Sequence, residues 1–246
     1  MWKAHKLAQA VYKNPKGTPP FVLQKAVDAY REIIKAYPGS LFAVQAEFSI
    51  GHLYLVKGDF DKARDVYKNL TTDCDKKGNL CAEGYFAIGK SYELQGRWAE
   101  ALLIYKKIMQ EYPFSAKSLD LPLYIIRHYR AEKNEMGLKS AADQGVAYYL
   151  GLKTQERGQK GAHILQSLIT RCYLESGMWQ DALDSLERYV RDYPDRDPQE
   201  AIFVKALLYA RKLNDKQKAK EELERIVKDY PDSKLAPQAK TLLGRL

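Results

Sequence analysis

The chain has 246 residues, of which 46% are hydrophobic, and a formal net charge of +9 at pH 7. A chain of this length and composition can bury a substantial core. No stretch approaches the roughly 20 apolar residues that span a bilayer, so the composition excludes a membrane-spanning protein.

The charge is unevenly distributed along the chain. The formal net charge is +5 for residues 1–40, 0 for 41–115, +3 for 116–162, −4 for 163–200 and +5 for 201–246. Basic ends and one acidic segment suit an acidic partner or a second copy of the chain; solvated helix faces rich in lysine are the alternative. The dense basic and aromatic clusters of a nucleic-acid surface are missing from the sequence, so we expect no nucleic-acid partner.

The beginning of the chain predicts a short helix over Trp2–Lys13 and a longer one over Phe21–Tyr37. The first six residues contain neither an apolar signal core nor a lipid-anchoring cysteine. They fit either a cytoplasmic protein or a mature domain that follows a removed leader.

Residues 48–70 introduce a pattern that recurs at 86–108. Apolar residues at three- and four-residue steps on both sides of a glycine predict two amphipathic helices joined by a tight turn. The turn column contains Gly58, Gly96 and Gly177, with Asn214 in the same place. Because glycine and asparagine tolerate positive φ best, we expect a left-handed residue at the end of each first helix.

Two further columns follow the same period, one of small and one of large residues. The small column contains Ala26, Ala63, Ala101, Ala182 and Ala219. The large column, four residues on, contains Tyr30, Tyr67, Tyr105, Leu186 and Leu223. We predict that each alanine lets the two helices approach and that the large side chain fills the space between them.

Tyr-Pro pairs end the second helices, because proline disfavours the α region for the residue before it and cannot donate a continuing hydrogen bond. The pairs begin at Tyr37, Tyr112, Tyr193 and Tyr230, which are 75, 81 and 37 residues apart. These spacings are close to multiples of one unit and predict an array.

The cysteines are too few for a disulfide scaffold. Cys74 and Cys81 fall in a helix-to-helix connection, where they would close a small loop in an oxidising compartment or stay as two thiols in a reducing one. Cys172 lies in a predicted helix and is most simply a small core residue.

Residues 119–162 depart from the pattern. Leu138 stands where the other units have alanine, and no Tyr-Pro pair closes the unit. The additional length falls at residues 151–161, which we predict to form an extended loop.

The leucine-glycine, tyrosine, alanine, aromatic and proline columns resemble the tetratricopeptide repeat, and the resemblance covers nearly the whole chain. It implies an all-α fold, a right-handed superhelical solenoid of antiparallel helix pairs over residues 1–246. The implied units are a degenerate one at 1–43, then 44–81, 82–118, 119–162, 163–199 and 200–236, with a capping helix at 236–246.

The sequence pattern at residues 37–51 and 229–233 is similar to that of bacterial cell-envelope members of this family, the outer-membrane assembly lipoprotein and the repeat domain of the Tol–Pal coordinator. That similarity implies a periplasmic or outer-membrane-associated location. A cytoplasmic location is the alternative.

Motifs that carry chemistry are missing from the sequence. His5, His52, His128 and His163 are scattered over four units, and none has a second histidine or a cysteine one turn away. The sequence also lacks a phosphate-binding loop and a nucleophile motif. We therefore expect no metal, no cofactor and no enzymatic activity.

The family resemblance implies that the first helix of each unit lines a concave groove. The column after the glycine position contains His52, Lys90, Arg127, Arg171 and Leu208, and the column one turn earlier contains Phe48, Phe86, Leu123, Ser167 and Val204. The predicted partner-binding groove comprises Phe48, His52, Phe86, Lys90, Arg127, Arg130 and Arg171. Such a surface suits a protein or peptide that carries carboxylates. The alternative is that the phenylalanines belong to the core and the arginines are solvated.

The resemblance implies a non-enzymatic scaffold for protein–protein interaction within a bacterial envelope assembly. Two alternatives stay open: a cytoplasmic adaptor, and a self-assembling scaffold whose basic ends contact the acidic unit of a neighbour. From packing, we also expect Ala63→Leu or Ala101→Leu to destabilise the array and Arg127→Glu to leave its stability nearly unchanged.

Overall fold

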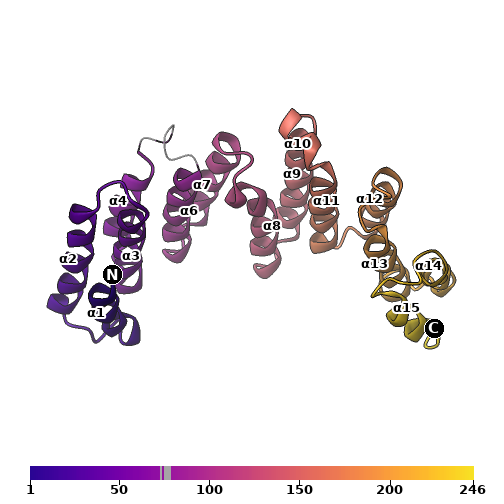
Figure 1. Cartoon of the computed structure of the whole chain (residues 1–246), viewed down its shortest axis with the longest axis horizontal. Helices are drawn as coiled ribbons and strands as arrows, with labels where there is room; N and C mark the ends of the chain where they lie inside the picture. The colour runs from indigo at the N-terminus through magenta and orange to yellow at the C-terminus, as the bar shows by residue number, and fades with distance from the viewer. Residues whose placement is uncertain (73, 75–78) are drawn as a thin grey trace. The chain divides into compact units, whose positions relative to one another are not determined.

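The computed structural model describes residues 1–72, 74 and 79–246, and every regular element among them is an α-helix (Figure 1). The predicted all-α architecture of paired helices is confirmed. The chain divides into two compact units, Met1–Leu121 and Pro122–Leu246, which we describe one at a time. The predicted single solenoid and its unit boundaries stay predictions.

The first unit is a series of helices from α1 to α7 in which each packs on the next described helix along the chain, and α1 also contacts α3. Its helices are α1 (Trp2–Lys13), α2 (Pro20–Ala36), α3 (Leu41–Lys57), α4 (Phe60–Leu70), α6 (Asn79–Leu94), α7 (Trp98–Glu111) and the first residues of α8 (Ala116–Ala131). The predicted helices at the beginning of the chain correspond to α1 and α2.

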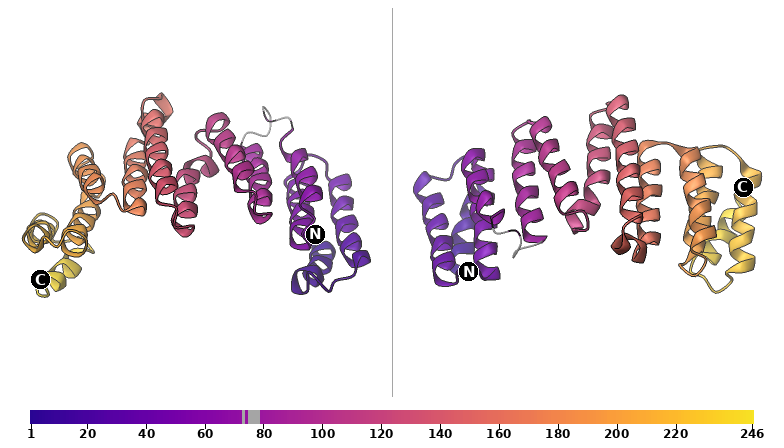
Figure 2. Two further views of the ribbon diagram at one scale, coloured as in Figure 1. Left: turned by 180° about the vertical axis from the view of Figure 1, so that it is seen from behind. Right: turned by 90° about the horizontal axis from the view of Figure 1, so that it is seen from above.

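The second unit contains the rest of α8 and all later helices (Figure 2). They are α9 (Glu135–Lys153), α10 (Glu156–Lys160), α11 (Ala162–Ser176), α12 (Trp179–Asp192), α13 (Pro198–Arg211), α14 (Lys216–Asp229) and α15 (Ala236–Leu243). Helix α11 packs on α9 and α12, and α15 packs on α14 at the end of the chain.

The turn column has the predicted backbone conformation. Gly58, Gly96 and Gly177 have φ of 79°, 78° and 75°, and Asn214 has φ of 54°. In the repeat at residues 119–162, which departs from the pattern and is called the irregular unit below, Lys133 takes this place with φ of 54°. The sequence did not reveal it, because lysine is not a residue type that signals positive φ.

The Tyr-Pro pairs end four helices in the same way. Helices α2, α7, α12 and α14 each stop at the residue before the tyrosine. The four tyrosines share φ between −135° and −128° and ψ between 53° and 59°. The predicted role of proline in ending the second helices is therefore confirmed.

The small and large columns form the centre of each regular helix pair. All five alanines have an exposed fraction of 0%, and the five large residues are buried as well. In the first unit the fit also depends on glycine, since a Cβ on Gly51 would lie 2.2 Å from the Tyr67 ring and one on Gly89 would lie 2.4 Å from the Tyr105 ring. The rings therefore pack directly against the backbone of the facing helix.

The prediction of an extended loop at residues 151–161 is wrong. Helix α9 continues to Lys153, and residues 156–160 form α10. A Cβ on Gly158 would lie 1.7 Å from the carbonyl oxygen of Leu152, so α10 folds back closely on the end of α9. A glycine that suggested a break in the sequence is needed here for close backbone approach.

The irregular unit exchanges its large and small residues between the two helices. Tyr129 lies on α8, and a Cβ on Gly137 of α9 would come within 2.5 Å of its ring. Leu138, the residue that departs from the alanine column, is buried next to this glycine. The ring thus comes from the first helix here, whereas the second helix supplies it in the first unit.

The cysteines separate into one disulfide and one buried thiol. Cys74 and Cys81 are joined by a disulfide, with their Cα atoms 5.7 Å apart, which corresponds to the first of the two alternatives for this pair. Cys172 is buried, as predicted, and burial raises the pKa of its thiol to about 12. It is therefore protonated and unreactive at neutral pH.

The core of the second unit contains a charged side chain. Lys205 of α13 is 4% exposed and pairs with Glu187 of α12 and, at 2.7 Å, with Glu222 of α14. Burial disfavours its charge, but the hydrogen bonds and charges of the two glutamates outweigh this effect and raise the pKa of Lys205. The lysine thus ties three successive helices together.

Candidate functional site

The structure places all seven residues of the predicted groove on first helices of the repeats. Phe48 and His52 lie on α3 and Phe86 and Lys90 on α6, all in the first unit. Arg127 and Arg130 lie on α8 and Arg171 on α11, all in the second unit.

The two phenylalanines of the first unit are half-buried against the rings that fill the helix pairs. The Phe48 ring centroid is 6.1 Å from that of Tyr67, and Phe86 is 5.7 Å from Tyr105. The Lys117 ammonium also lies 4.6 Å from the Phe86 ring centroid. Both phenylalanines therefore contribute to packing within their unit.

The two basic residues predicted on these helices also have neighbours in the same unit. The His52 ring lies 5.1 Å from the ring of Tyr12 on α1. Lys90 donates to Glu93 at 3.0 Å, and the other oxygen of Glu93 accepts a hydrogen bond from Tyr105 at 2.9 Å. The Lys90–Glu93 pair has the i, i+3 spacing of a helical ion pair, a signal that sequence reasoning missed.

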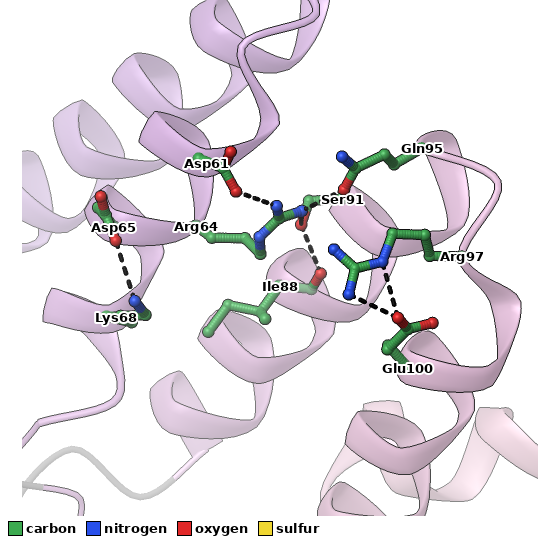
Figure 3. Close-up of polar contacts among 9 residues, drawn as sticks. All are labelled: Asp61, Arg64, Asp65, Lys68, Ile88, Ser91, Gln95, Arg97 and Glu100. Atoms are coloured by element: carbon green, nitrogen blue, oxygen red, sulfur yellow. Dashed lines mark hydrogen bonds and ion pairs between the residues drawn. The ribbon is translucent and has the colours of Figure 1, made fainter.

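Another basic side chain of the first unit, that of Arg64, is buried where two repeats meet (Figure 3). Arg64 of α4 is 5% exposed and donates to Ser91 of α6 at 3.3 Å and to Gln95, the residue after α6, at 3.0 Å. Its guanidinium lies 4.3 Å from the Tyr92 ring centroid, and it also pairs with Asp61. Arg64 therefore connects successive repeats.

In the second unit, Arg127 and Arg130 share one carboxylate. Arg127 donates to Glu175 of α11 at 2.9 Å and 2.7 Å, and Arg130 pairs with the same glutamate at 2.5 Å. Burial of Glu175 opposes its ionisation, but the hydrogen bonds and charges of the arginines prevail and lower its pKa. The expectation that Arg127→Glu leaves stability nearly unchanged stays a prediction, and the pair with Glu175 argues against it, because the change would place two glutamates together.

A cavity of about 300 Å³ opens between α11, α12 and α13. Its apolar wall contains Leu174, Leu186, Ala201 and Val204. Four residues around it are exposed, namely Ser167, Arg171, Asp197 and Glu200. The cavity is thus accessible from solvent and has a size at the small end of ligand pockets.

The three uncharged polar side chains that line the cavity are already hydrogen-bonded, and Ser167 donates to the carbonyl oxygen of His163 at 3.1 Å. Thr170 donates to the carbonyl oxygen of Gln166 at 3.1 Å and shares a hydrogen bond of 2.8 Å with Ser185. Tyr189 donates to the carbonyl oxygen of Arg196 at 2.8 Å. The wall therefore accepts an apolar group without leaving these three hydroxyls unpaired.

The cavity brings together residues from both predicted columns. Ser167 and Val204 belong to the earlier column, and Arg171 belongs to the column after the glycine position. Sequence reasoning missed Asp197 and Glu200, which bring negative charge to the other side. A signal existed in the net charge of −4 over residues 163–200, but it did not identify which carboxylates meet Arg171.

Groups of side chains suited to metal binding are missing from the described residues. Across residues 1–72, 74 and 79–246, we find no helix with the length and hydropathy needed to cross a bilayer.

Comparisons with solved structures give relatives of low similarity. Repeats of a putative kinesin light chain from Podosopora anserina, described as nearly identical TPR-like repeats, are 18% identical over 80% of this chain and 96% of that chain, with a TM-score of 0.44. BtubC (BKLC) from P. vanneervenii is 15% identical over 90% and 89%, with a TM-score of 0.45. The TPR2AB domain of yeast Sti1, in a complex with pHSP90, is 13% identical over 98% and 96%, with a TM-score of 0.36.

Sequence comparison gives a clearer result. Two family models described as tetratricopeptide repeat match the chain, one at residues 166–196 and 200–233, the other at 23–76 and 48–116. No curated protein sequence matches the chain. The two family models together cover more than half of the 246 residues, and the chain therefore belongs to the tetratricopeptide repeat family.

Proposed function

We propose that this protein is a non-enzymatic scaffold that binds a segment of a partner protein on the face formed by the first helices of its repeats. The observation that carries this proposal is the cavity between α11, α12 and α13, because residues from both predicted groove columns line it. A solvent-accessible apolar cavity with a few charged groups around it is the usual form of a recognition site.

The contacts of the predicted residues restrict where binding occurs. Lys90 pairs with Glu93, and Arg127 and Arg130 pair with Glu175. An incoming carboxylate would have to compete with these glutamates for the basic side chains. At Arg171 an incoming carboxylate would meet no competing glutamate, since Arg171 belongs to no ion pair of the described residues. The second unit therefore offers the better surface for a partner.

We further propose a bacterial cell-envelope assembly as the setting, with this chain on the periplasmic side. Two observations support it: the similarity of the Tyr-Pro phrasing to envelope members of the family, and the disulfide between Cys74 and Cys81. Disulfides persist in oxidising compartments and are rare in the cytoplasm of mesophiles. If thiol alkylation in intact cells modifies both cysteines without prior reduction, the cytoplasmic adaptor is the correct alternative.

The binding face can be tested with two charge-neutral double variants. Arg171→Glu/Glu200→Lys exchanges the charges beside the cavity, and Arg188→Glu/Glu224→Lys makes the same changes on α12 and α14. After matched folding is established by thermal denaturation, proteins captured from the native organism by each variant are compared with those captured by the wild-type chain. We expect the first variant to lose a specific partner that the second retains; loss from the second alone would place binding on the second helices.

A further inference from the structure

The charges beside the α11–α13 cavity are separated by sign. Arg171 lies on α11, whereas Asp197 and Glu200 lie at the beginning of α13. Neither Arg171 nor Glu200 takes part in an ion pair among the described residues. The cavity thus has one basic and one acidic side, and both are available to a ligand.

The acidic side extends into a second cavity of about 370 Å³. Asp197 lines both cavities, and the second is also lined by three further aspartates. Asp195 and Asp232 follow Tyr-Pro pairs, and Asp229 is the last residue of α14. Of these aspartates, Asp229 also pairs with Arg225, at 3.8 Å. The aspartates of the second cavity therefore extend the acidic side away from the apolar wall.

The apolar wall and the charge gradient together define a ligand. The wall has its own hydroxyls satisfied and accepts a large apolar side chain. Lysine or arginine side chains beside that anchor would meet Asp197, Glu200 and the aspartates of the second cavity. On the opposite side Arg171 would repel a basic residue and attract an acidic one, which fixes the direction of the bound segment.

Resting on the proposed function, we infer that the α11–α13 cavity binds a partner segment with one large apolar anchor followed by two or more basic residues. The apolar side chain fills the cavity, and the basic residues lie along the acidic side that leads to the second cavity. The partner is thus basic where it meets this part of the chain. The basic stripe in the sequence had instead suggested an acidic one.

The probe is a phage-displayed library of random dodecapeptides, selected on the full-length protein and on its Ser167→Phe variant. Ser167 is exposed beside the wall, so a phenylalanine there occupies the cavity without disturbing the core. We expect the wild-type chain to enrich peptides that combine a large apolar residue with a basic cluster on one side. The Ser167→Phe variant should fail to enrich them.

Binding of a fluorescent peptide with the enriched sequence then separates the roles of anchor and charge. We expect Ser167→Phe to weaken binding at least about tenfold, and Ser140→Phe on α9 to change it less than about twofold. Glu200→Lys should weaken binding about tenfold, whereas Glu224→Lys on α14 should have little effect. Thermal denaturation of all four variants establishes that they fold.

Four results would overturn the inference. Acidic peptides, or peptides whose binding does not respond to Ser167→Phe, would reject this ligand while leaving the scaffold function intact. A concentration-dependent mass abolished by Ser167→Phe would assign the cavity to a second copy of the chain. If no peptide is enriched and the two double variants capture the same proteins as the wild type, the proposed function itself fails.

Discussion

The two compact units fill the space around their helix pairs with different side chains. In the first unit, the rings of Phe86 and Tyr105 lie beside each other, and those of Phe48 and Tyr67 do the same one repeat earlier. The corresponding positions of the pair α11–α12 are occupied by Ser167 and Leu186. Both of these residues line the cavity of about 300 Å³.

The missing aromatic rings explain the cavity. Two aromatic rings are replaced by a hydroxymethyl and an isobutyl group, and the facing helix cannot move in to compensate, because Thr170 stands where the first unit has Gly89. Interiors are close-packed, so lost ring volume that is not recovered by approach of the helices remains as space. The α11–α12 pair, which lacks both rings, thus leaves room for a ligand.

The largest effect should come from overfilling a ring-filled pair. Ala101 has an exposed fraction of 0% and lies on α7, which packs on α6. Ala101→Leu should therefore lower the free energy of unfolding by about 3 kcal/mol. The control Ala99→Leu, exposed on the same helix, should change it by less than about 0.5 kcal/mol. Denaturant unfolding gives both values, and equal losses would mean that the helix pair is not packed as described.

Exchanging the large residues between the units tests the cause of the cavity directly. Tyr105→Leu should cost about 2 kcal/mol, since it removes ring contacts and the hydrogen bond to Glu93. The reverse change, Leu186→Tyr, should alter stability by less than about 1 kcal/mol, because the cavity accepts the ring. If Leu186→Tyr proves as destabilising as Tyr105→Leu, the space beside Leu186 is not available in solution.

The disulfide should stabilise the first unit by about 2 kcal/mol, because it closes a short loop between positions 74 and 81. Unfolding curves of the wild-type chain with and without reductant should differ by this amount. The Cys74→Ser/Cys81→Ser variant should match the reduced wild type and ignore the reductant. Identical curves for oxidised and reduced wild type would show that the bond contributes nothing.

The smallest effect should come from the ion pairs between α8 and α11. Arg127 and Arg130 have side-chain exposures of 45% and 52%, so Glu175→Gln should cost less than about 1 kcal/mol at pH 7. Because the folded state lowers the pKa of Glu175, this stabilisation is present at neutral pH and disappears as the pH falls through that lowered pKa.

A pH series of unfolding free energies for wild type and Glu175→Gln checks this sign. The difference should shrink toward zero in acid, and the control Glu135→Gln, exposed at the beginning of α9, should show no comparable trend. A difference that grows in acid would contradict the pairing.

Features set by local chemistry could be predicted from the sequence. The glycine turns, the alanine and large columns and the Tyr-Pro helix ends each depend on residues within one helix pair, and the structure confirms all three. Features that depend on distant residues could not. The fold-back of α10 requires contact between Gly158 and Leu152, and Glu175 neutralises Arg127 from 48 positions away.

The candidate site was predicted only in part for the same reason. Repeat equivalence identified the two columns that meet at the cavity, including Ser167, Arg171 and Val204. Neither column contains Asp197 or Glu200, because both lie at the beginning of α13, before the column positions of that helix. Arg171 and the two carboxylates come from consecutive repeats and meet at one cavity only in the folded chain, where α11 and α13 both line it.

The most direct test of the central claim is photo-crosslinking in the native organism from one position in each unit. A photoreactive phenylalanine derivative replaces Lys90 on α6 or Arg171 on α11, and adducts are identified by mass spectrometry. The proposed function predicts a partner adduct from position 171 and none from position 90. An adduct from position 90 alone would contradict it and place binding on the ring-filled unit.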